Sequence, residues 1–142
     1  MILETAFMCM ALNIYHEAKN QSMLGQIAVG QVVMNRVEDS RFPDNVCDVV
    51  TQGVTYKGTD KPVLHKCQFS WYCDGQKDEP NFDSEEWWKA QEYASIVLSG
   101  TIVLDVTEGA THYHATYVRP AWAKTKKRTT RIDRHIFYRW ER

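Results

Sequence analysis

The sequence of 142 residues contains no hydrophobic run that approaches the length of a membrane span. A transmembrane helix needs about 18–20 predominantly apolar residues. The N-terminus reads Met-Ile-Leu-Glu, which is acidic rather than basic, and no small-residue cleavage pattern follows it. We therefore expect no membrane insertion and no signal peptide, so that the chain either stays where it is made or leaves by a route that the sequence does not encode.

A zinc-binding cysteine pattern is also absent. Of the four cysteines, Cys67 and Cys73 are six residues apart, while Cys9 and Cys47 are isolated. Cys9 falls away from the apolar centre of the first predicted helix, and we expect it to have no role. Cys47, Cys67 or Cys73 could form a disulfide in an oxidising compartment, although the count does not require one.

Internal repeats and low-complexity segments are absent as well, and residues 1–142 are predicted to form a single domain that can bury a core. The composition, 44% hydrophobic and 25% charged, is ordinary for a soluble globular protein. The net charge of −1 hides an asymmetry, because residues 1–118 carry 8 basic and 16 acidic side chains, whereas residues 119–142 carry 9 and 2. Such a basic end suits an anionic polymer, such as cell wall or nucleic acid, or neutralises the acidic body of the fold.

Hydrophobic periodicity predicts helices first and strands last, which is an α+β fold. Ser22 is a good N-cap for the second helix, in which Gly25 and Gly30 suggest close contact with another element. Gly53 is expected to cap a short third helix, and residues 54–66 to form a surface loop. The predicted helices span residues 3–20, 22–37, 44–52 and about 84–100, and the predicted strands span residues 101–107, 111–118 and 131–140.

Glu17 has an unusual place in the first helix. On a helical wheel it projects from an apolar stripe that includes Phe7, Met10 and Ile14, whereas Asn13 lies on the polar side. An ionised carboxylate in apolar surroundings is costly, so its pKa rises, and the C-terminal end of a helix disfavours the negative charge further. A carboxylic acid that stays protonated near neutral pH is what a glycosidase general acid requires. An ion pair with one of the arginines is the structural alternative.

An aromatic stretch could join Glu17 in a sugar-binding site. It comprises Gln68-Phe69-Ser70-Trp71, and the segment 111–117 could contribute from the other end of the chain. Aromatic rings stack on the apolar face of a pyranose, while amides and hydroxyls bind its edges. The alternative is that Phe69 and Trp71 belong to the core.

Two further groups of residues compete with this site. His112 and His114 would share one face of a strand and could begin a zinc site, completed by His65, His135 or a carboxylate, but no HExxH motif supports it. A basic run could hold phosphates, yet no helix-turn-helix, zinc-finger or RNA-binding motif accompanies it. That run consists of Lys124, Lys126, Lys127, Arg128, Arg131 and Arg134.

Several motifs, in this order and spacing, resemble the catalytic domain of the SleB-type cell-wall hydrolases over nearly the whole chain. The resemblance implies cleavage of peptidoglycan in its glycan strand, one essential glutamate that matches Glu17, and a compact α+β domain that is distantly lysozyme-like. The motifs are Ala11-Leu-Asn-Ile-Tyr-His-Glu17-Ala, Gly25-Gln-Ile-Ala-Val-Gly-Gln-Val-Val-Met-Asn35-Arg36-Val37, Arg41-Phe-Pro43, Val46-Cys47-Asp-Val-Val-Thr-Gln-Gly53, Cys67-Gln-Phe-Ser-Trp71, Cys73-Asp-Gly75, Gly109-Ala-Thr-His-Tyr-His114 and Arg134-His-Ile-Phe-Tyr138.

The resemblance also suggests a lytic transglycosylase mechanism. Glycosidases usually need two carboxylates. In a transglycosylase, Glu17 alone would protonate the bond between MurNAc and GlcNAc and then accept the proton of the sugar's own 6-hydroxyl, which forms a 1,6-anhydromuramoyl end. No second carboxylate stands out among the candidates, which are Asp74, Asp105, Glu108 and Asp133.

We predict that Gln68, Ser70, His112 and Tyr113 hold the muramoyl residue, and that the site needs no metal and no cofactor. The expected partner is the peptidoglycan glycan strand rather than nucleic acid, and the expected state is a monomer. The site of action would be the bacterial cell wall, periplasmic or extracellular, and the lack of a signal peptide favours a phage lysin made in the cytoplasm and then released. The alternatives are a zinc-dependent N-acetylmuramoyl-L-alanine amidase and a non-catalytic wall-binding module.

Overall fold

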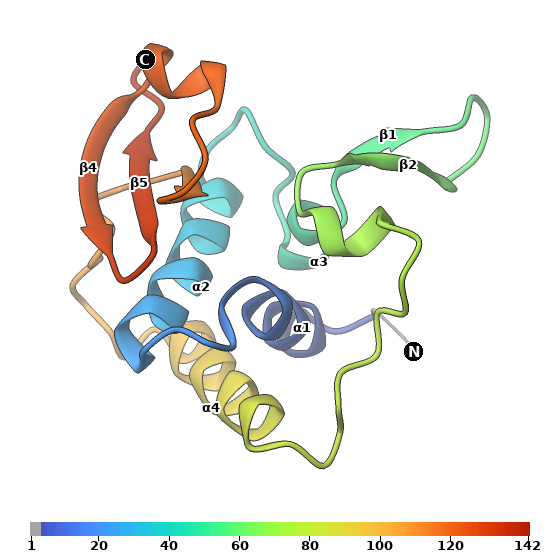
Figure 1. Ribbon diagram of the computed structural model, residues 1–142, viewed down its shortest axis with the longest axis horizontal. Coiled ribbons are helices and arrows are strands. Elements are labelled where there is room, and N and C mark those ends of the chain that lie inside the picture. Colours follow the sequence, from blue (N-terminus) through green and yellow to red (C-terminus); the bar gives the residue numbers. More distant parts are fainter. Residues whose placement is uncertain (1–3) are drawn as a thin grey trace.

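The computed structural model describes residues 4–142 and has the expected α+β architecture (Figure 1). Three long helices cross one another beside a three-stranded antiparallel sheet, and a separate two-stranded hairpin lies on the other side of the molecule. In chain order the elements are α1 (Ala6–Ala18), α2 (Met23–Glu38), α3 (Val46–Val50), β1 (Gly53–Thr55), β2 (Pro62–Cys67), the 3-10 helix η1 (Ser70–Cys73), α4 (Glu85–Ser99), β3 (His112–Ala115), the 3-10 helix η2 (Ala121–Thr125), β4 (Lys127–Ile132) and β5 (His135–Arg139).

Side-chain caps set the helix boundaries. The predicted N-cap Ser22 accepts a hydrogen bond from Gly25 N (3.2 Å), and Ser84 accepts one from Trp87 N (3.1 Å). Gly100 ends α4 in the left-handed conformation, with φ of +73°, as a C-terminal glycine commonly does. The predicted start of the first helix at Leu3 lies outside the described residues.

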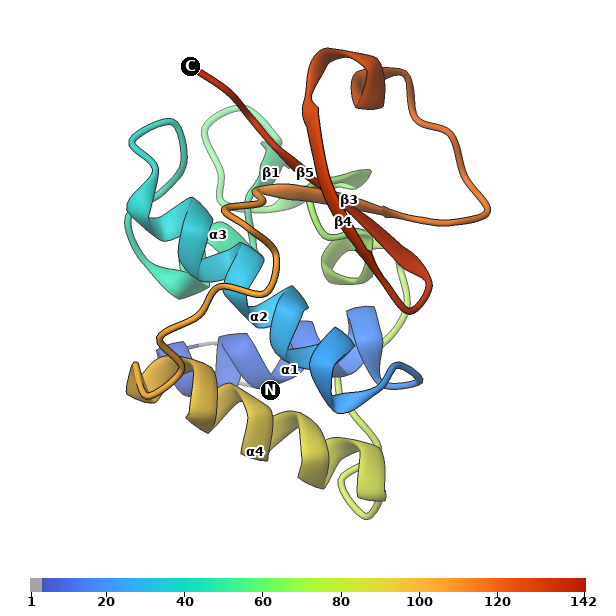
Figure 2. The same ribbon diagram turned by 90° about the vertical axis from the view of Figure 1, so that its left-hand side faces the viewer.

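Helix α2 is the central element, because it packs on α1 and α4 with one side and on the sheet with the other (Figure 2). A Cβ atom added at Gly30 would lie 3.0 Å from Val97 of α4 and 3.3 Å from Ile14 of α1. The close contact predicted from this glycine is therefore present. Towards the sheet, Ala28 and Val32 pack with the fully buried Phe137.

Helix α1 is more buried than its wheel predicts. Asn13, which was placed on the polar side, is fully buried, and its Oδ1 accepts a hydrogen bond from the indole of Trp71. Phe7, placed in the apolar stripe, is 37% exposed because it lies in the first turn of the helix. Three neighbours, α2, α3 and α4, surround the middle of α1, so burial there extends round the helix.

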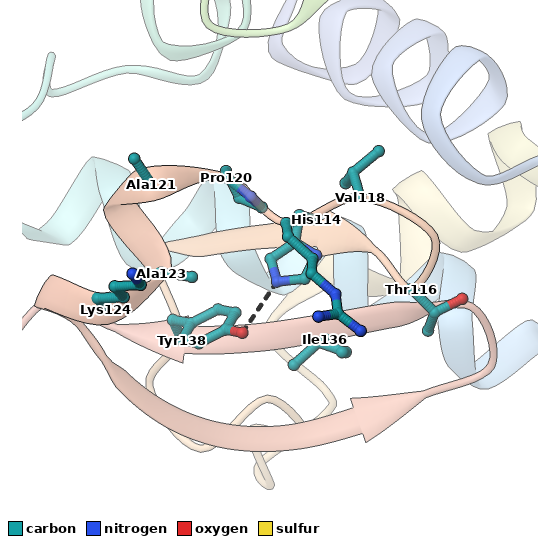
Figure 3. A pocket seen from close by; sticks show the side chains of 10 residues that line it. His114, Thr116, Val118, Pro120, Ala121, Ala123, Lys124, Ile136 and Tyr138 are labelled. Atoms are coloured by element: carbon teal, nitrogen blue, oxygen red, sulfur yellow. Dashed lines mark hydrogen bonds between the residues drawn. The ribbon is translucent and has the colours of Figure 1, made fainter.

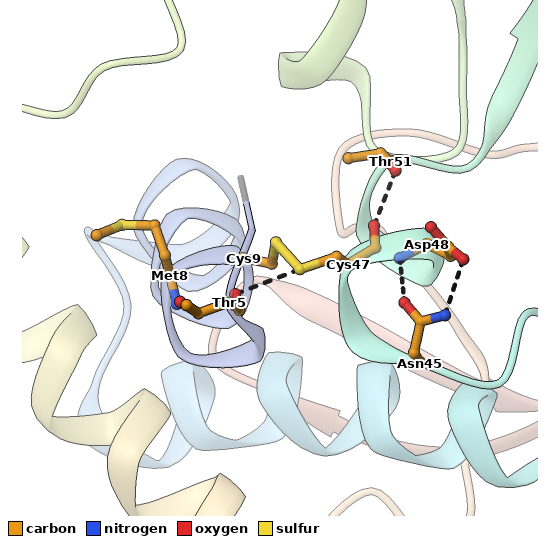
Figure 4. The surroundings of a disulfide bond; sticks show 7 residues. All are labelled: Thr5, Met8, Cys9, Asn45, Cys47, Asp48 and Thr51. Carbon is orange, nitrogen blue, oxygen red and sulfur yellow. Dashed lines mark hydrogen bonds between the residues drawn. A yellow bond between two sulfur atoms is a disulfide. The ribbon is translucent and has the colours of Figure 1, made fainter. Parts of the chain in front are cut away.

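Residues 4–142 contain two disulfides. Cys9 of α1 is bonded to Cys47 of α3 (Figure 4). Cys67 at the end of β2 is bonded to Cys73 of η1. The expectation that Cys9 has no role was wrong. Cys9 is fully buried because α3 packs against that side of α1, a contact that periodicity within one helix cannot reveal.

The three-stranded sheet has the order β3–β5–β4 and is antiparallel throughout. Its register pairs His112 with Tyr138 and Tyr113 with Phe137. Because side chains alternate between faces along a strand, Tyr113 and Phe137 point towards the helices, and His112 and Tyr138 point to the opposite face. This alternation decides which predicted residues can reach Glu17.

Three predictions for the irregular segments were wrong. Residues 54–66 form the hairpin β1–β2 rather than a loop, and Gly53 begins β1 rather than capping a helix, since a Cβ there would come within 2.8 Å of the Cys67 backbone. Residues 131–140 are not one strand, because a turn at Asp133, with φ of +50°, separates β4 from β5.

The predicted strand 101–107 is an irregular connection. Side chains form hydrogen bonds with the backbone groups that would otherwise pair in a sheet. Gln31 of α2 donates to Leu104 O and accepts from Val106 N, both at 3.0 Å. The carboxylate of Asp105 accepts hydrogen bonds from the backbone of Thr107 and Gly109. These hydrogen bonds outweigh the strand propensity of the β-branched residues in this segment.

Within residues 4–142, none of the helices has the length and apolar character that crossing a membrane requires.

Candidate active site

Glu17 lies one residue before the end of α1 and is partly buried. Its Oε1 accepts a hydrogen bond of 2.5 Å from the hydroxyl of Tyr113 on β3, 96 residues further along the chain. Burial raises the pKa of Glu17 above its ordinary value, while the hydrogen bond from Tyr113 and the charge of Arg36 oppose part of that rise. The pKa of Glu17 is thus raised as the sequence predicted, but its surroundings are not only apolar, because the Tyr113 hydroxyl and the charge of Arg36 also act on the carboxyl group.

Tyr113 is held as a hydrogen-bond donor. Burial and the neighbouring Glu17 raise the pKa of its hydroxyl well above the ordinary value, so the phenol keeps its proton. Its ring packs against His135, at 4.8 Å between ring centroids, and against Phe137, at 5.5 Å. These contacts fix the ring, so that the hydroxyl is directed at one oxygen of Glu17.

Arg36 brings a buried positive charge to this site. Its Nε donates to Thr111 O (2.7 Å), and the guanidinium lies over the rings of Phe42 (4.9 Å) and Phe69 (5.1 Å). The side chain is only 5% exposed, and its charge lowers the pKa of Glu17. Sequence reasoning assigned it no role, although an arginine within the mostly apolar helix 22–37 was a signal that could have identified it.

Trp71 and His16 stack on each other beside the C-terminal half of α1, the helix that carries Glu17. The Trp71 indole N–H donates to Asn13 Oδ1 (2.9 Å), and the ring of His16 stacks on the indole at 4.6 Å between centroids. The other side of His16 is fixed through its Nε2, which lies 2.7 Å from Asp78 O. Trp71 is therefore a core residue, as the structural alternative proposed, yet it anchors the aromatic stretch to the helix that carries Glu17.

Similarity to known protein families shows to which family the chain belongs. A sequence model of the family described as Cell Wall Hydrolase matches residues 20–138. The chain belongs to the cell wall hydrolase family. The matched region includes Arg36 and Tyr113, and Glu17 lies three residues before its start.

Individual relatives agree with this family assignment and with the SleB resemblance. The chain is 29% identical over 133 residues to the spore cortex-lytic enzyme of Halalkalibacterium halodurans, which covers 90% of this chain but only 33% of that protein. The chain therefore spans about a third of the length of this curated relative. The crystal structure of the catalytic domain of the Bacillus cereus SleB protein superposes with a TM-score of 0.67 at 26% identity, covering 94% of this chain and 89% of that one.

A second solved structure shows the same fold. It is the catalytic domain of the germination-specific lytic transglycosylase SleB from Bacillus anthracis, with a TM-score of 0.70 at 24% identity over 94% of this chain and 93% of that one. The α+β fold predicted for the chain is confirmed by both structures.

Gln68 and Ser70 lie on either side of the buried Phe69 in this cell wall hydrolase, and both are exposed. The backbone N–H of Gln68 donates to Gln52 O (2.9 Å). Within residues 4–142, neither side chain is hydrogen-bonded to Glu17. Their exposure leaves them free to meet a ligand, and their role in holding the muramoyl residue stays a prediction.

His112 lies on the face of β3 opposite Tyr113. Its ring packs against Phe42, Trp122 and Trp140, with centroids 5.3–6.1 Å apart. Burial and the charge of Arg36 lower the pKa of His112 to about 4, so the imidazole is neutral near pH 7. Tyr113 is hydrogen-bonded to Glu17, whereas His112 points to the other face, and the roles of both in holding the muramoyl residue stay predictions.

His112 and His114 share one face of β3, as the zinc alternative requires. His114 Nε2, however, lies 2.9 Å from the hydroxyl of Tyr138. His135, offered as a third ligand, is on the other face beside Tyr113. Within residues 4–142, no group of three or more His, Cys, Asp or Glu side chains is placed to hold a metal ion.

Two of the candidate second carboxylates have structural partners. Asp105 accepts hydrogen bonds from Asn35, Thr107 and Gly109. Burial raises its pKa, but these hydrogen bonds together lower it below the ordinary value. Asp133 accepts from both the backbone N–H and the hydroxyl of Ser22. The neighbours that shift the pKa of Glu17 are instead Tyr113 and Arg36, neither of which is a carboxylate.

Proposed function

We propose that this chain cleaves the glycan strand of peptidoglycan between MurNAc and GlcNAc, as a lytic transglycosylase in which Glu17 is the acid and then the base. The observation that carries the proposal is a partly buried carboxyl group with a raised pKa, hydrogen-bonded by a tyrosine whose own proton is retained. Membership of the cell wall hydrolase family and the names of the relatives support the same substrate.

The hydrogen bond from Tyr113 would determine which oxygen of Glu17 carries the acidic proton. Because the phenol donates to Oε1, the carboxylic proton belongs on Oε2. Oε2 would then protonate the glycosidic oxygen as the bond to the anomeric carbon of MurNAc breaks. The leaving GlcNAc end departs as an alcohol, and Glu17 becomes a carboxylate.

In the second step the 6-hydroxyl of the same muramoyl residue attacks its anomeric carbon. The Glu17 carboxylate accepts the hydroxyl proton, which regenerates the acid and produces the 1,6-anhydro end. Since the nucleophile belongs to the substrate, its effective concentration is high and no second carboxylate is needed to activate water. Asp105 and Asp133, which already have hydrogen-bond partners of their own, are consistent with this one-carboxylate scheme.

Tyr113 and Arg36 would stabilise Glu17 between the two steps. The anionic form of Glu17 is disfavoured by burial, and it is favoured by the hydrogen bond from Tyr113 and the positive charge of Arg36. Burial would keep Glu17 protonated before the first step. Tyr113 and Arg36 would keep it acidic enough to give that proton to the glycosidic oxygen.

We also propose that the chain acts as a monomer on the bacterial cell wall, outside the cytoplasm. The two disulfides support an oxidising location, because such bonds are rare in reducing compartments. Release of a phage lysin is one route to that location.

Mass spectrometry of digested peptidoglycan tests the proposal. Purified sacculi incubated with the protein are expected to release muropeptides with 1,6-anhydromuramoyl ends. Reducing MurNAc ends would identify a hydrolytic muramidase instead. Free stem peptides would identify an amidase, and no soluble product with retained wall binding would identify a binding module.

A further inference from the structure

A cavity of about 680 Å³ lies on the face of the sheet opposite Tyr113, under the connection between β3 and β4 (Figure 3). Its volume is in the range of pockets that bind small ligands. His114 and Thr116 enter it from β3 and its extension, and Ile136 and Tyr138 enter it from β5. The segment 118–124 forms the remaining wall.

The lining combines positive charge with an apolar surface. Arg119 and Lys124 border the cavity, and among residues 4–142 neither forms an ion pair with an Asp or Glu. A hydrogen bond of 2.9 Å between His114 Nε2 and the Tyr138 hydroxyl adds a polar edge. The apolar lining residues are Val118, Pro120, Ala121, Ala123 and Ile136.

We propose that this cavity binds the peptide stem that hangs from the muramoyl residue. The inference rests on the proposed function and adds a second subsite to it. A peptidoglycan stem is a short peptide with alanine methyl groups and free carboxylates, so the small apolar side chains would contact the methyl groups. Arg119 and Lys124 would pair with the carboxylates, which are the complementary charge.

Strand β3 connects the two sites. Tyr113 points to one face and reaches Glu17, and the next residue, His114, points to the other face and lines the cavity. An extended stem of four residues spans about 13 Å, since each residue adds about 3.3 Å. The stem would pass around the outer side of β3, which is the edge strand of the three-stranded sheet.

Binding of the isolated stem tetrapeptide tests the inference without any catalytic step. We expect saturable binding by calorimetry, with the amide NMR signals of His114 and Tyr138 shifting during the titration. The double variant Arg119→Ala/Lys124→Ala is expected to weaken binding by about tenfold or more, because each lost bond joins two charged groups.

The matched control is Lys127→Ala/Arg128→Ala, which removes the same charge from β4 outside the cavity. We expect it to change the affinity by less than about twofold, since exposed charges at a distance are screened. Circular dichroism and melting curves of both variants confirm that they fold. Equal losses in the two variants, or no saturable binding by the parent protein, would overturn the inference.

Two further measurements distinguish a stem-binding site from a general anion site and from failure of the proposed function. Inorganic phosphate that displaces the tetrapeptide with similar affinity would reveal a general anion site, and the stem assignment would be wrong. On glycan stripped of its stems by an amidase, the parent is expected to lose affinity to the level of Arg119→Ala/Lys124→Ala. If no anhydro ends form from either glycan while the tetrapeptide binds, the proposed function fails and the peptide site remains.

Discussion

Replacing Glu17 with Gln is the most informative single change in this protein. The amide is nearly the same size as the carboxyl group and keeps an oxygen that can accept the hydrogen bond from Tyr113. It can neither give nor take a proton. Loss of general acid–base action is typically worth about 10²–10⁴-fold in rate, and one residue fills both roles here, so we expect a loss of about 10⁴-fold or more. That corresponds to about 5.5 kcal/mol of activation free energy.

The same substitution has a distinct effect on stability. Because burial raises the pKa of Glu17, the folded state binds its proton more tightly than the unfolded chain does. The stabilisation is fully present below the unfolded pKa and is lost as the pH rises through the higher, folded pKa. The Gln side chain does not titrate, so the variant's stability lacks this pH dependence. The melting temperature of Glu17→Gln minus that of the parent should therefore increase as the pH rises across that window.

The assays are anhydromuropeptide release and scanning calorimetry at several pH values. Glu92→Gln, at an exposed carboxylate of α4, is the matched control and should change neither result. Near-parental activity of Glu17→Gln would refute the acid–base assignment. A lower melting temperature at every pH would instead identify Glu17 as a structural carboxylate.

Three further perturbations test the site and its surroundings. Tyr113→Phe removes the hydrogen bond to Glu17, which becomes ionised as it gives up its proton. A hydrogen bond to an ionised group is worth about 1.5–3 kcal/mol, so kcat should fall roughly 10–100-fold. The alkaline limb of its pH–rate profile should also move upward, since that bond lowers the pKa of Glu17, and an unmoved limb would contradict the assignment. Activity in a metal chelator should be unchanged, whereas a loss restored by zinc would favour the amidase. Neutralising Lys126, Lys127 and Arg128, which lie outside the cavity, should lower activity on intact walls at low salt more than activity on soluble fragments, because exposed charges are screened by salt. Equal losses on both substrates would exclude wall attachment by these three side chains.

Local signals in the sequence were sufficient for the two long helices α2 and α4. Ser22 and Ser84 begin α2 and α4 because each hydroxyl accepts a backbone hydrogen bond within its own first turn. Gly100 ends α4 because it adopts a positive φ. Such interactions involve residues three or four apart, so they can be recognised without knowing the fold. The strands were less predictable, because backbone pairing depends on partners elsewhere in the chain.

The sequence by itself determined the α+β class, the family and the unusual position of Glu17 on its helix. These depend on periodicity, order and residue type, all of which can be read along the chain. Only the tertiary structure decided that Tyr113 rather than His112 contacts Glu17, because that choice follows from which face of β3 packs against the helices. The role of Arg36 also needed the structure, since its burial against the rings of Phe42 and Phe69 is a property of the packed core. A side chain's environment is set by neighbours that are remote in sequence, and for that reason the chemistry at Glu17 depends on the completed fold.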